Sequence, residues 1–152
     1  MVLQKKQLIA LENKHIAAYL AQDSLQTYQA STTGFWYAYQ QKSTSNTPLP
    51  QAGDLVRLRY NISTLDNTVL YSATALGTKN YLVDKEDFIP ALQDGVKLMR
   101  VGETMTFIIP SYRGFGLVGD GEKIPPNQTL KSTVTLIAIK FKTPYETSST
   151  KS

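Results

Sequence analysis

The residue types that most often carry enzyme chemistry are scarce in this sequence. It contains no cysteine and a single histidine, His15. The missing cysteines exclude disulfide bonds and thiolate metal sites, and one imidazole argues against a histidine metal site or a Ser-His-Asp triad. His15 lies in a polar, helical context and is predicted to be a surface residue. The residues themselves imply no metal and no other cofactor.

The charge pattern narrows the classes of partner. Sixteen Lys and Arg residues against twelve Asp and Glu give a net charge of +4. Lys5-Lys6 is the only adjacent basic pair, which is too little to follow a phosphate backbone, so we expect no nucleic-acid partner. No stretch approaches the ~20 apolar residues that span a bilayer, and the amino terminus lacks a signal-peptide pattern. A cytosolic protein and an exported protein whose leader has been removed both stay open.

Apolar periodicity predicts the elements that would position a site. Residues 3 to about 23 favour a helix, because Ile9, Ile16 and Leu20 recur on one face without an internal Gly or Pro. This helix either docks on the rest of the chain, which is the simpler interpretation, or pairs with a second copy to form a homodimer. Residues 1–33 are thus a helix and an extended lead-in, and residues 34–52 are an aromatic strand and a polar linker.

Short strands dominate the rest of the chain. Val56 to Ile62 alternate apolar and polar side chains, which predicts a strand with one buried face. The other predicted segments are a hairpin partner strand at 69–71, a short helix at 90–96, a strand at 104–109, a loop at 111–127 and a last strand at 129–141. In that last strand Leu130, Val134, Leu136 and Ile139 are predicted to face inward. Residues 142–152 are predicted to be a mobile tail. The fold class expected is α+β with an antiparallel sheet.

The order and spacing of these segments resemble the FKBP family of peptidyl-prolyl isomerases. The stretches that carry the resemblance are Gly53-Asp54-Leu55-Val56-Arg57-Leu58-Arg59-Tyr60, Leu65-Asp66-Asn67-Thr68-Val69-Leu70-Tyr71-Ser72, Phe88-Ile89-Pro90-Ala91-Leu92, Val101-Gly102-Glu103, Ile109-Pro110-Ser111-Tyr112, Phe115-Gly116 and Lys123-Ile124-Pro125-Pro126-Asn127. The resemblance covers residues 53–141. It implies an FKBP-like twisted antiparallel sheet wrapped around a short helix, with an apolar pocket between them and an extra amino-terminal helix.

The implied chemistry suits the sparse inventory of reactive residues. Rotation about an X–Pro bond faces a barrier of ~18–20 kcal/mol, because amide resonance must be broken. An apolar cavity that favours the twisted amide over the planar one lowers this barrier without a nucleophile or a metal. The implied partners are proline-containing peptides or unfolded protein segments.

The resemblance assigns pocket positions to four residues. Tyr60 matches a wall tyrosine, and Ile124 matches the isoleucine that closes one side. Phe88 and Ile89 match a pair whose second residue offers backbone hydrogen bonds to the substrate. Tyr81 falls where the family keeps an aromatic strand residue.

Five further positions depart from the family pattern. Leu70 stands where a Phe wall is usual, and Tyr71 stands where an Asp organises hydrogen bonds. Leu92 replaces the Trp of the pocket floor, Phe115 replaces a Tyr whose hydroxyl grips a substrate carbonyl, and Ser132 replaces a late-strand Phe. These changes remove one carboxylate, one hydroxyl and much of the aromatic lining. We expect a wider pocket and slower isomerisation.

Within the family, the chain is most similar to the gliding-motility-associated isomerase lipoproteins of Bacteroidetes. The helix, Gly34-Phe35-Trp36-Tyr37 and Ser111-Tyr112-Arg113-Gly114-Phe115-Gly116 carry this similarity. It implies a lipid-anchored protein of the periplasm or envelope of a Gram-negative bacterium, which assists the folding of exported proteins. Two alternatives stay open: a peptide-binding or chaperone module that has lost catalysis, and a scaffold subunit of a motility or secretion complex.

Overall fold

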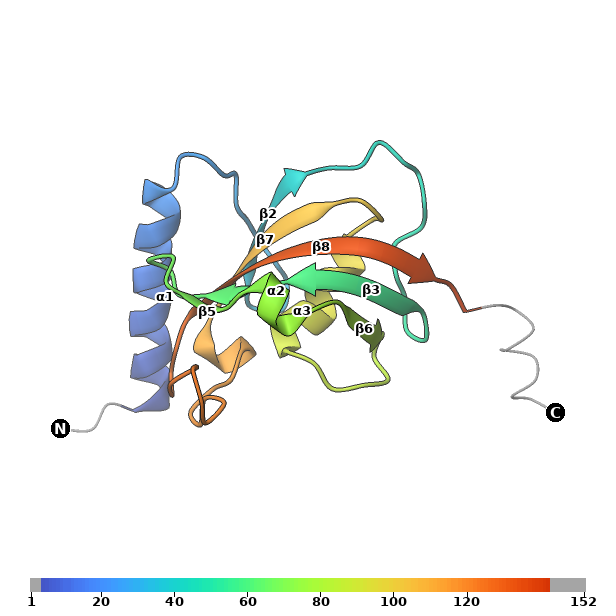
Figure 1. Cartoon of the computed structure of the whole chain (residues 1–152). Helices are drawn as coiled ribbons and strands as arrows, with labels where there is room; N and C mark the ends of the chain where they lie inside the picture. Colours follow the sequence, from blue (N-terminus) through green and yellow to red (C-terminus); the bar gives the residue numbers. More distant parts are fainter. Residues whose placement is uncertain (1–3, 143–152) are drawn as a thin grey trace.

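An antiparallel sheet organises the computed structural model, which describes residues 4–142 (Figure 1). From the amino to the carboxyl end the elements are α1 (Lys5–Gln22), β1 (Gln29–Ala30), β2 (Trp36–Gln41), β3 (Leu55–Tyr60), β4 (Ile62–Ser63), β5 (Val69–Tyr71), α2 (Ala73–Leu76), β6 (Lys79–Leu82), α3 (Pro90–Gly95), the 3₁₀ turn η1 (Val96–Leu98), β7 (Thr104–Ile109), the 3₁₀ turn η2 (Ser111–Arg113) and β8 (Leu130–Lys140). The strand order is β1-β2-β7-β8-β3-β6, with β4 paired to β5 and β8. The predicted α+β class is confirmed.

Strand β3 has the alternation that its sequence predicts. Val56, Leu58 and Tyr60 are buried, while the residues between them are exposed. The predicted strand from 56 to 62 is nevertheless interrupted at Asn61, so that Ile62 belongs to the separate strand β4. The reason is that the Asn61 side-chain oxygen accepts the backbone N–H of Thr133 at 2.8 Å, a bond made in place of a regular ladder contact.

A bulge in β8 reverses which residues face the core. Leu58 of β3 pairs with Leu136, but Arg57 pairs with Ala138, so one residue of β8 is skipped. The inward positions therefore change from even numbers up to Leu136 to the odd-numbered Ile139, because successive side chains of a strand alternate faces. Leu130, Val134 and Leu136 are buried and Ile139 is half-buried against the core, as predicted.

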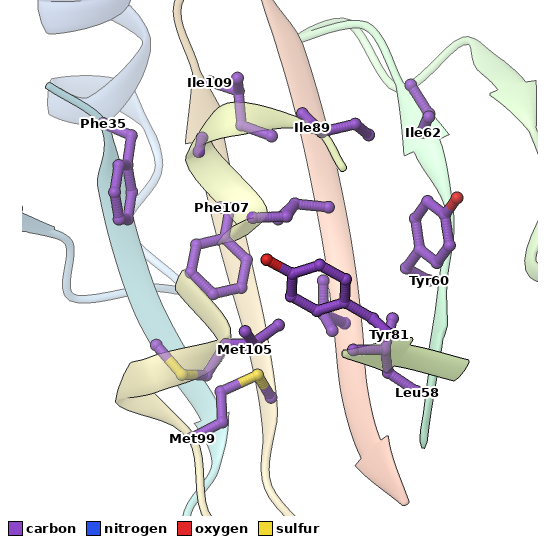
Figure 2. Packing of buried hydrophobic residues seen from close by; sticks show 14 of the residues in the cluster. Phe35, Leu58, Tyr60, Ile62, Tyr81, Ile89, Met99, Met105, Phe107 and Ile109 are labelled. Atoms are coloured by element: carbon purple, nitrogen blue, oxygen red, sulfur yellow. The ribbon is translucent and has the colours of Figure 1, made fainter. Parts of the chain in front are cut away.

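The short helix α3 packs on the concave face of the sheet. It begins at Pro90, whose missing N–H costs nothing in a first turn. It lies so close to β7 that a Cβ at Gly95 would be 2.6 Å from the ring of Phe107. Figure 2 shows Phe107, Met105 and Tyr81 filling the space between the strands and this helix.

The amino-terminal helix docks on the domain, as in the simpler of the two interpretations. Ile16 is fully buried, whereas Leu8 and Leu11 stay 37% and 44% exposed. The carboxylate of Glu12 accepts hydrogen bonds from the N–H and the hydroxyl of Ser111, at 2.6 and 2.7 Å. Figure 1 shows α1 upright at one end of the sheet, beside the loop that leads into β8. His15 is exposed, as predicted.

Several elements of the structure were not predicted from the sequence. The strand β1, the short helix α2 and the 3₁₀ turn η2 inside the predicted loop all lack a detectable apolar period, because each is four residues or fewer. No helix among residues 4–142 is both long and apolar enough to cross a membrane. Of the predicted mobile tail, 142–152, Lys142 is described and donates its backbone N–H to the carboxylate of Asp54 at 2.8 Å. Residues 143–152 lie outside the described residues.

Candidate functional site

A pocket of about 430 Å³ opens between the end of the sheet, the start of α3 and the loop after η2. Its walls are mostly aromatic and aliphatic, with a few charged groups at the rim. The lining residues are Tyr60, Ile62, Tyr71, Leu76, Lys79, Asp87, Phe88, Ile89, Pro90, Gly114, Phe115, Asp120 and Ile124. A mostly apolar concavity with a small number of polar groups is the usual form of a ligand site.

An aromatic cluster forms one wall. The ring of Phe88 meets that of Tyr60 edge to face, with the ring centres 5.3 Å apart, and lies 5.1 Å from the ring of Tyr81. The ammonium group of Lys79 lies 5.1 Å from the centre of the Phe88 ring, in cation–π geometry. Phe88 is thus contacted on several sides and offers a preorganised apolar surface.

The start of α3 leaves one backbone donor open. The carbonyl of Ile89 accepts the N–H groups of Leu92 and Gln93, at 2.8 and 2.9 Å. The N–H of Ile89 donates to no residue within 4–142, and Pro90, the first residue of the helix, has no N–H. Ile89 lines the pocket and is 7% exposed. The pocket therefore combines apolar walls with an unpaired backbone donor at its edge.

A tyrosine and a carboxylate meet across the mouth. The hydroxyl of Tyr71, at the end of β5, donates a hydrogen bond to the carboxylate of Asp120 in the loop. The other oxygen of Asp120 accepts the N–H groups of Glu122 and Ile124, at 2.9 and 2.8 Å. The bond to the carboxylate raises the pKa of Tyr71 to about 12. The same bond lowers the pKa of Asp120 below its usual range. At neutral pH the pair is a protonated phenol donating to an ionised carboxylate.

Six of the eight predicted pocket residues lie together around this space, namely Tyr60, Tyr71, Phe88, Ile89, Phe115 and Ile124. Leu70 and Leu92 do not line it. Leu70, which precedes Tyr71 in β5, is half-buried against the core. Leu92 is fully buried on the inner face of α3, where its short side chain does not reach the pocket.

Two further residues that the resemblance singled out, Tyr81 and Ser132, are buried outside the pocket lining. Tyr81 is fully buried behind Phe88, and its hydroxyl accepts the N–H of Asp84 at 3.1 Å. Ser132 is fully buried in β8, and its hydroxyl donates to the carbonyl of Asn61 at 2.7 Å. Neither side chain lines the pocket.

Several lining residues were missed from the sequence. The most consequential is Asp120, which brings to the pocket the carboxylate that position 71 lacks. No periodic signal could have placed it, since it lies in a loop. Lys79 could have been found, because it is two residues from Tyr81 and so shares its face of β6. Among residues 4–142, no group of three or more His, Cys, Asp or Glu side chains is arranged to hold a metal ion.

Known proteins resemble this chain in sequence and in fold. The family described as FKBP-type peptidyl-prolyl cis-trans isomerase matches residues 47–137. A probable FKBP-type isomerase FkpA of Neisseria meningitidis is 36% identical over 90 residues, which are 59% of this chain and 33% of that protein. FkpA of Aeromonas hydrophila is 32% identical over 133 residues, 86% of this chain and 48% of that protein. Isomerase FKBP9 of Homo sapiens is 33% identical over 92 residues, 60% of this chain and 16% of that protein. The chain thus spans less than half the length of each of these relatives.

Two solved structures share the fold. A peptidyl-prolyl isomerase of Pseudomonas syringae superposes with a TM-score of 0.73 at 20% identity, over 93% of this chain and 99% of that one. FkpA of Escherichia coli superposes with a TM-score of 0.70 at 24% identity, over 90% of this chain and 62% of that one. Both superpositions cover more of this chain than residues 47–137, which match the family.

Proposed function

The chain belongs to the family of FKBP-type peptidyl-prolyl cis-trans isomerases, and we propose that it accelerates cis–trans isomerisation of X–Pro bonds in the pocket beside α3. The observation that carries this proposal is the open N–H of Ile89 at the edge of apolar walls. A proline ring packs against Phe88, and the Ile89 N–H holds a neighbouring substrate carbonyl. The twisted amide, which is less polar than the planar one, is then favoured by its surroundings.

Nuclear magnetic resonance exchange spectroscopy on a blocked Ala-Leu-Pro-Phe peptide tests the proposal. Uncatalysed exchange takes tens to hundreds of seconds, so catalysis produces exchange cross-peaks that grow with protein concentration. Phe88→Ala is expected to reduce the acceleration about tenfold or more, because it removes the central wall ring. Phe141→Ala is the matched control, since Phe141 is 40% exposed and lies outside the pocket lining. Folded native protein that produces no exchange would overturn the proposal.

A peptide-binding or chaperone module without useful turnover is the second candidate. It is favoured by Leu92, which leaves the pocket floor without an aromatic ring, and by Phe115, which brings no hydroxyl. This candidate predicts peptide binding in a titration but no exchange cross-peaks. A scaffold role predicts neither peptide binding nor exchange cross-peaks. It predicts that the protein stays associated with other subunits during purification from native cells.

We also propose that the protein works in the cell envelope of a Gram-negative bacterium, assists the folding of exported proteins and belongs to the gliding-motility-associated lipoproteins. The resemblance in 34–37 and 111–116 supports this proposal. Fractionation of native cells and mass spectrometry of the mature amino terminus test it. A soluble-fraction protein with an unmodified terminus would rule out the lipid anchor.

Homodimer formation through α1 is a separate proposal, supported by the exposure of Leu8 and Leu11 on the docked helix. Sedimentation velocity of the native chain and of a Leu8→Ser, Leu11→Ser variant tests it. A dimer that persists in the variant would assign the contact to another surface.

A further inference from the structure

The aromatic residues around the pocket differ in whether they carry a hydroxyl that is free to bind a substrate. Two tyrosines, Tyr60 and Tyr71, line it, whereas Phe115 has no hydroxyl to offer. Tyr81 is too deep to take part, and its hydroxyl already accepts a backbone N–H. A substrate that seeks a side-chain hydroxyl donor in this pocket therefore meets only Tyr60 or Tyr71 among the lining residues.

The proton of Tyr71 is already in use. Its hydroxyl donates to Asp120, whose carboxylate is held in place by two backbone N–H groups of its own loop. A phenol has one proton to donate, and charge-assisted hydrogen bonds are among the strongest in proteins. Donation to a substrate carbonyl would require Tyr71 to abandon an ionised carboxylate for a neutral acceptor. Tyr71 is therefore a poor substrate donor.

The proton of Tyr60 is not in use. Within residues 4–142 its hydroxyl makes no hydrogen bond, although the residue is only 9% exposed. The ring is fixed by edge-to-face contact with Phe88 and by the pairing of its backbone with Val134 in β8. Burial raises the pKa of Tyr60, so the phenol stays protonated at neutral pH. Figure 2 shows Tyr60 and Ile62 on the same side of the core, with Ile89 across from Ile62.

We propose that the Tyr60 hydroxyl binds a carbonyl of the peptide beside the X–Pro bond and supplies the donor that Phe115 lacks. This inference rests on the proposed function. The hydroxyl keeps access to the pocket and has no acceptor among residues 4–142, so a substrate carbonyl can accept its proton without displacing an existing partner. The acceptor is a flanking carbonyl and not the oxygen of the rotating amide, since a hydrogen bond to that oxygen would strengthen the resonance that rotation must break. Tyr60 and the Ile89 N–H then grip the peptide on either side of the reacting bond.

This assignment makes Tyr60 a contributor to binding of ground and transition state alike. Loss of a uniform binding contact raises KM and leaves kcat unchanged. A merely structural role for Tyr60 would instead lower the stability of the fold. Because the hydroxyl has no hydrogen-bond partner among residues 4–142, Tyr60→Phe is expected to keep the melting temperature of the native protein.

The test uses the full chain and a blocked Ala-Leu-Pro-Phe peptide. Tyr60→Phe is expected to raise KM about five- to tenfold, the loss of one hydrogen bond, with kcat within about twofold. Tyr37→Phe is the matched control, because its hydroxyl bonds to Gln29 outside the pocket lining. Phe115→Tyr in the Tyr60→Phe background is expected to restore much of the lost affinity. An unchanged KM in Tyr60→Phe overturns the assignment.

A second measurement keeps this inference separate from catalysis. The dissociation constant of the same peptide, followed by chemical shifts, is expected to rise five- to tenfold in Tyr60→Phe whether or not the native chain turns over. With tyrosine labelled at the ring carbon that bears the oxygen, peptide should shift the Tyr60 signal and leave that of Tyr37 unmoved. Absence of exchange in the native chain would overturn the proposed isomerase activity but not the assignment of Tyr60. A Tyr60 signal that does not shift at peptide saturation would overturn the Tyr60 assignment.

Discussion

The hydroxyl of Tyr71 donates to the carboxylate of Asp120 and so joins strand β5 to the loop on the far side of the pocket mouth. Within the described part of the chain, the other hydrogen-bonding contact between 64–78 and 114–128 involves the same hydroxyl, which lies 3.4 Å from a carboxylate oxygen of Glu122. One side chain therefore carries the polar connection between the two sides. The carboxylate that position 71 lacks is not lost from the pocket; it enters from the loop.

The hydrogen bond between Tyr71 and Asp120 is expected to stabilise the fold only within a defined pH range. The pKa of Tyr71 is raised to about 12 by its bond to Asp120, so this contribution is complete below about pH 10 and disappears as pH rises through 12. The pKa of Asp120 is lowered by the same bond, so its contribution is complete above about pH 4 and disappears as pH falls through the folded-state pKa. Both ends of the range follow from one hydrogen bond.

Melting temperatures of the native protein and Tyr71→Phe, measured from pH 2 to pH 12, should therefore differ by a constant amount between about pH 5 and pH 9. The difference should shrink toward both extremes, because either protonation of Asp120 or ionisation of Tyr71 ends the bond. A difference that is as large at pH 2 as at pH 7 would contradict this account.

Restoring the family carboxylate at position 71 is expected to harm this protein. Tyr71→Asp removes the phenol and places a second carboxylate beside Asp120, which keeps its backbone donors. Repulsion between like charges at the pocket mouth should lower the melting temperature by about 2–4 °C and weaken peptide binding. Asp120→Asn in the same background should recover part of both losses. Faster isomerisation by Tyr71→Asp alone would show that the loop carboxylate does not substitute for the missing one.

The frame of the site could be predicted from the sequence because it rests on the local periodicity of apolar residues and on a single proline. The alternation in β3 places Tyr60 on the inner face, and Pro90 marks the start of α3 and hence the position of Ile89. These signals depend on local periodicity and on the chemistry of single residues, which survive without knowledge of the fold.

The polar part of the site could not be predicted in the same way. Asp120 reaches Tyr71 across 49 residues of sequence, and its loop has no period that would orient a side chain. The identity of position 71 alone indicated a lost carboxylate, whereas the structure shows a compensating one. Leu92 illustrates a different limit: the sequence places it in α3, but it is fully buried and is not among the residues that line the pocket.

A pair of glycines in the pocket loop allows the loop conformation to be tested. Gly119 and Gly121 both have positive φ, +63° and +75°. A Cβ at Gly119 would lie 2.1 Å from the carbonyl oxygen of Ile124, whereas one at Gly121 would meet nothing within 4 Å. Gly119→Ala must therefore displace Ile124 and the turn that Asp120 closes, in addition to bearing the strain of positive φ that both variants share.

We expect Gly119→Ala to weaken peptide binding at least tenfold, because Ile124 forms a wall of the pocket. Gly121→Ala should cost about 1 kcal/mol of stability and leave binding close to native. Titration of both variants with the same peptide separates the two effects. Equal losses in the two variants would mean that backbone strain, and not the position of Ile124, controls the pocket.

The docked helix is expected to support the pocket through Glu12. Its carboxylate accepts the N–H and hydroxyl of Ser111 and the hydroxyl of Thr129. Ser111 begins η2, whose last residue, Arg113, pairs with Asp94 of α3 at 2.7 Å. Glu12→Ala leaves the backbone donor of a residue that is only 7% exposed without its partner. The free energy of unfolding should fall by about 1–3 kcal/mol.

Urea denaturation and hydrogen exchange measure these effects together. In Glu12→Ala the amides of α1 should exchange faster than in Lys14→Ala, which alters an exposed position two residues away on the same helix. Peptide affinity should fall as well, since Gly114 and Phe115 follow η2 directly and line the pocket. If α1 exchanges as slowly as in Lys14→Ala while stability is unchanged, then the buried face around Ile16, and not Glu12, holds the helix in place.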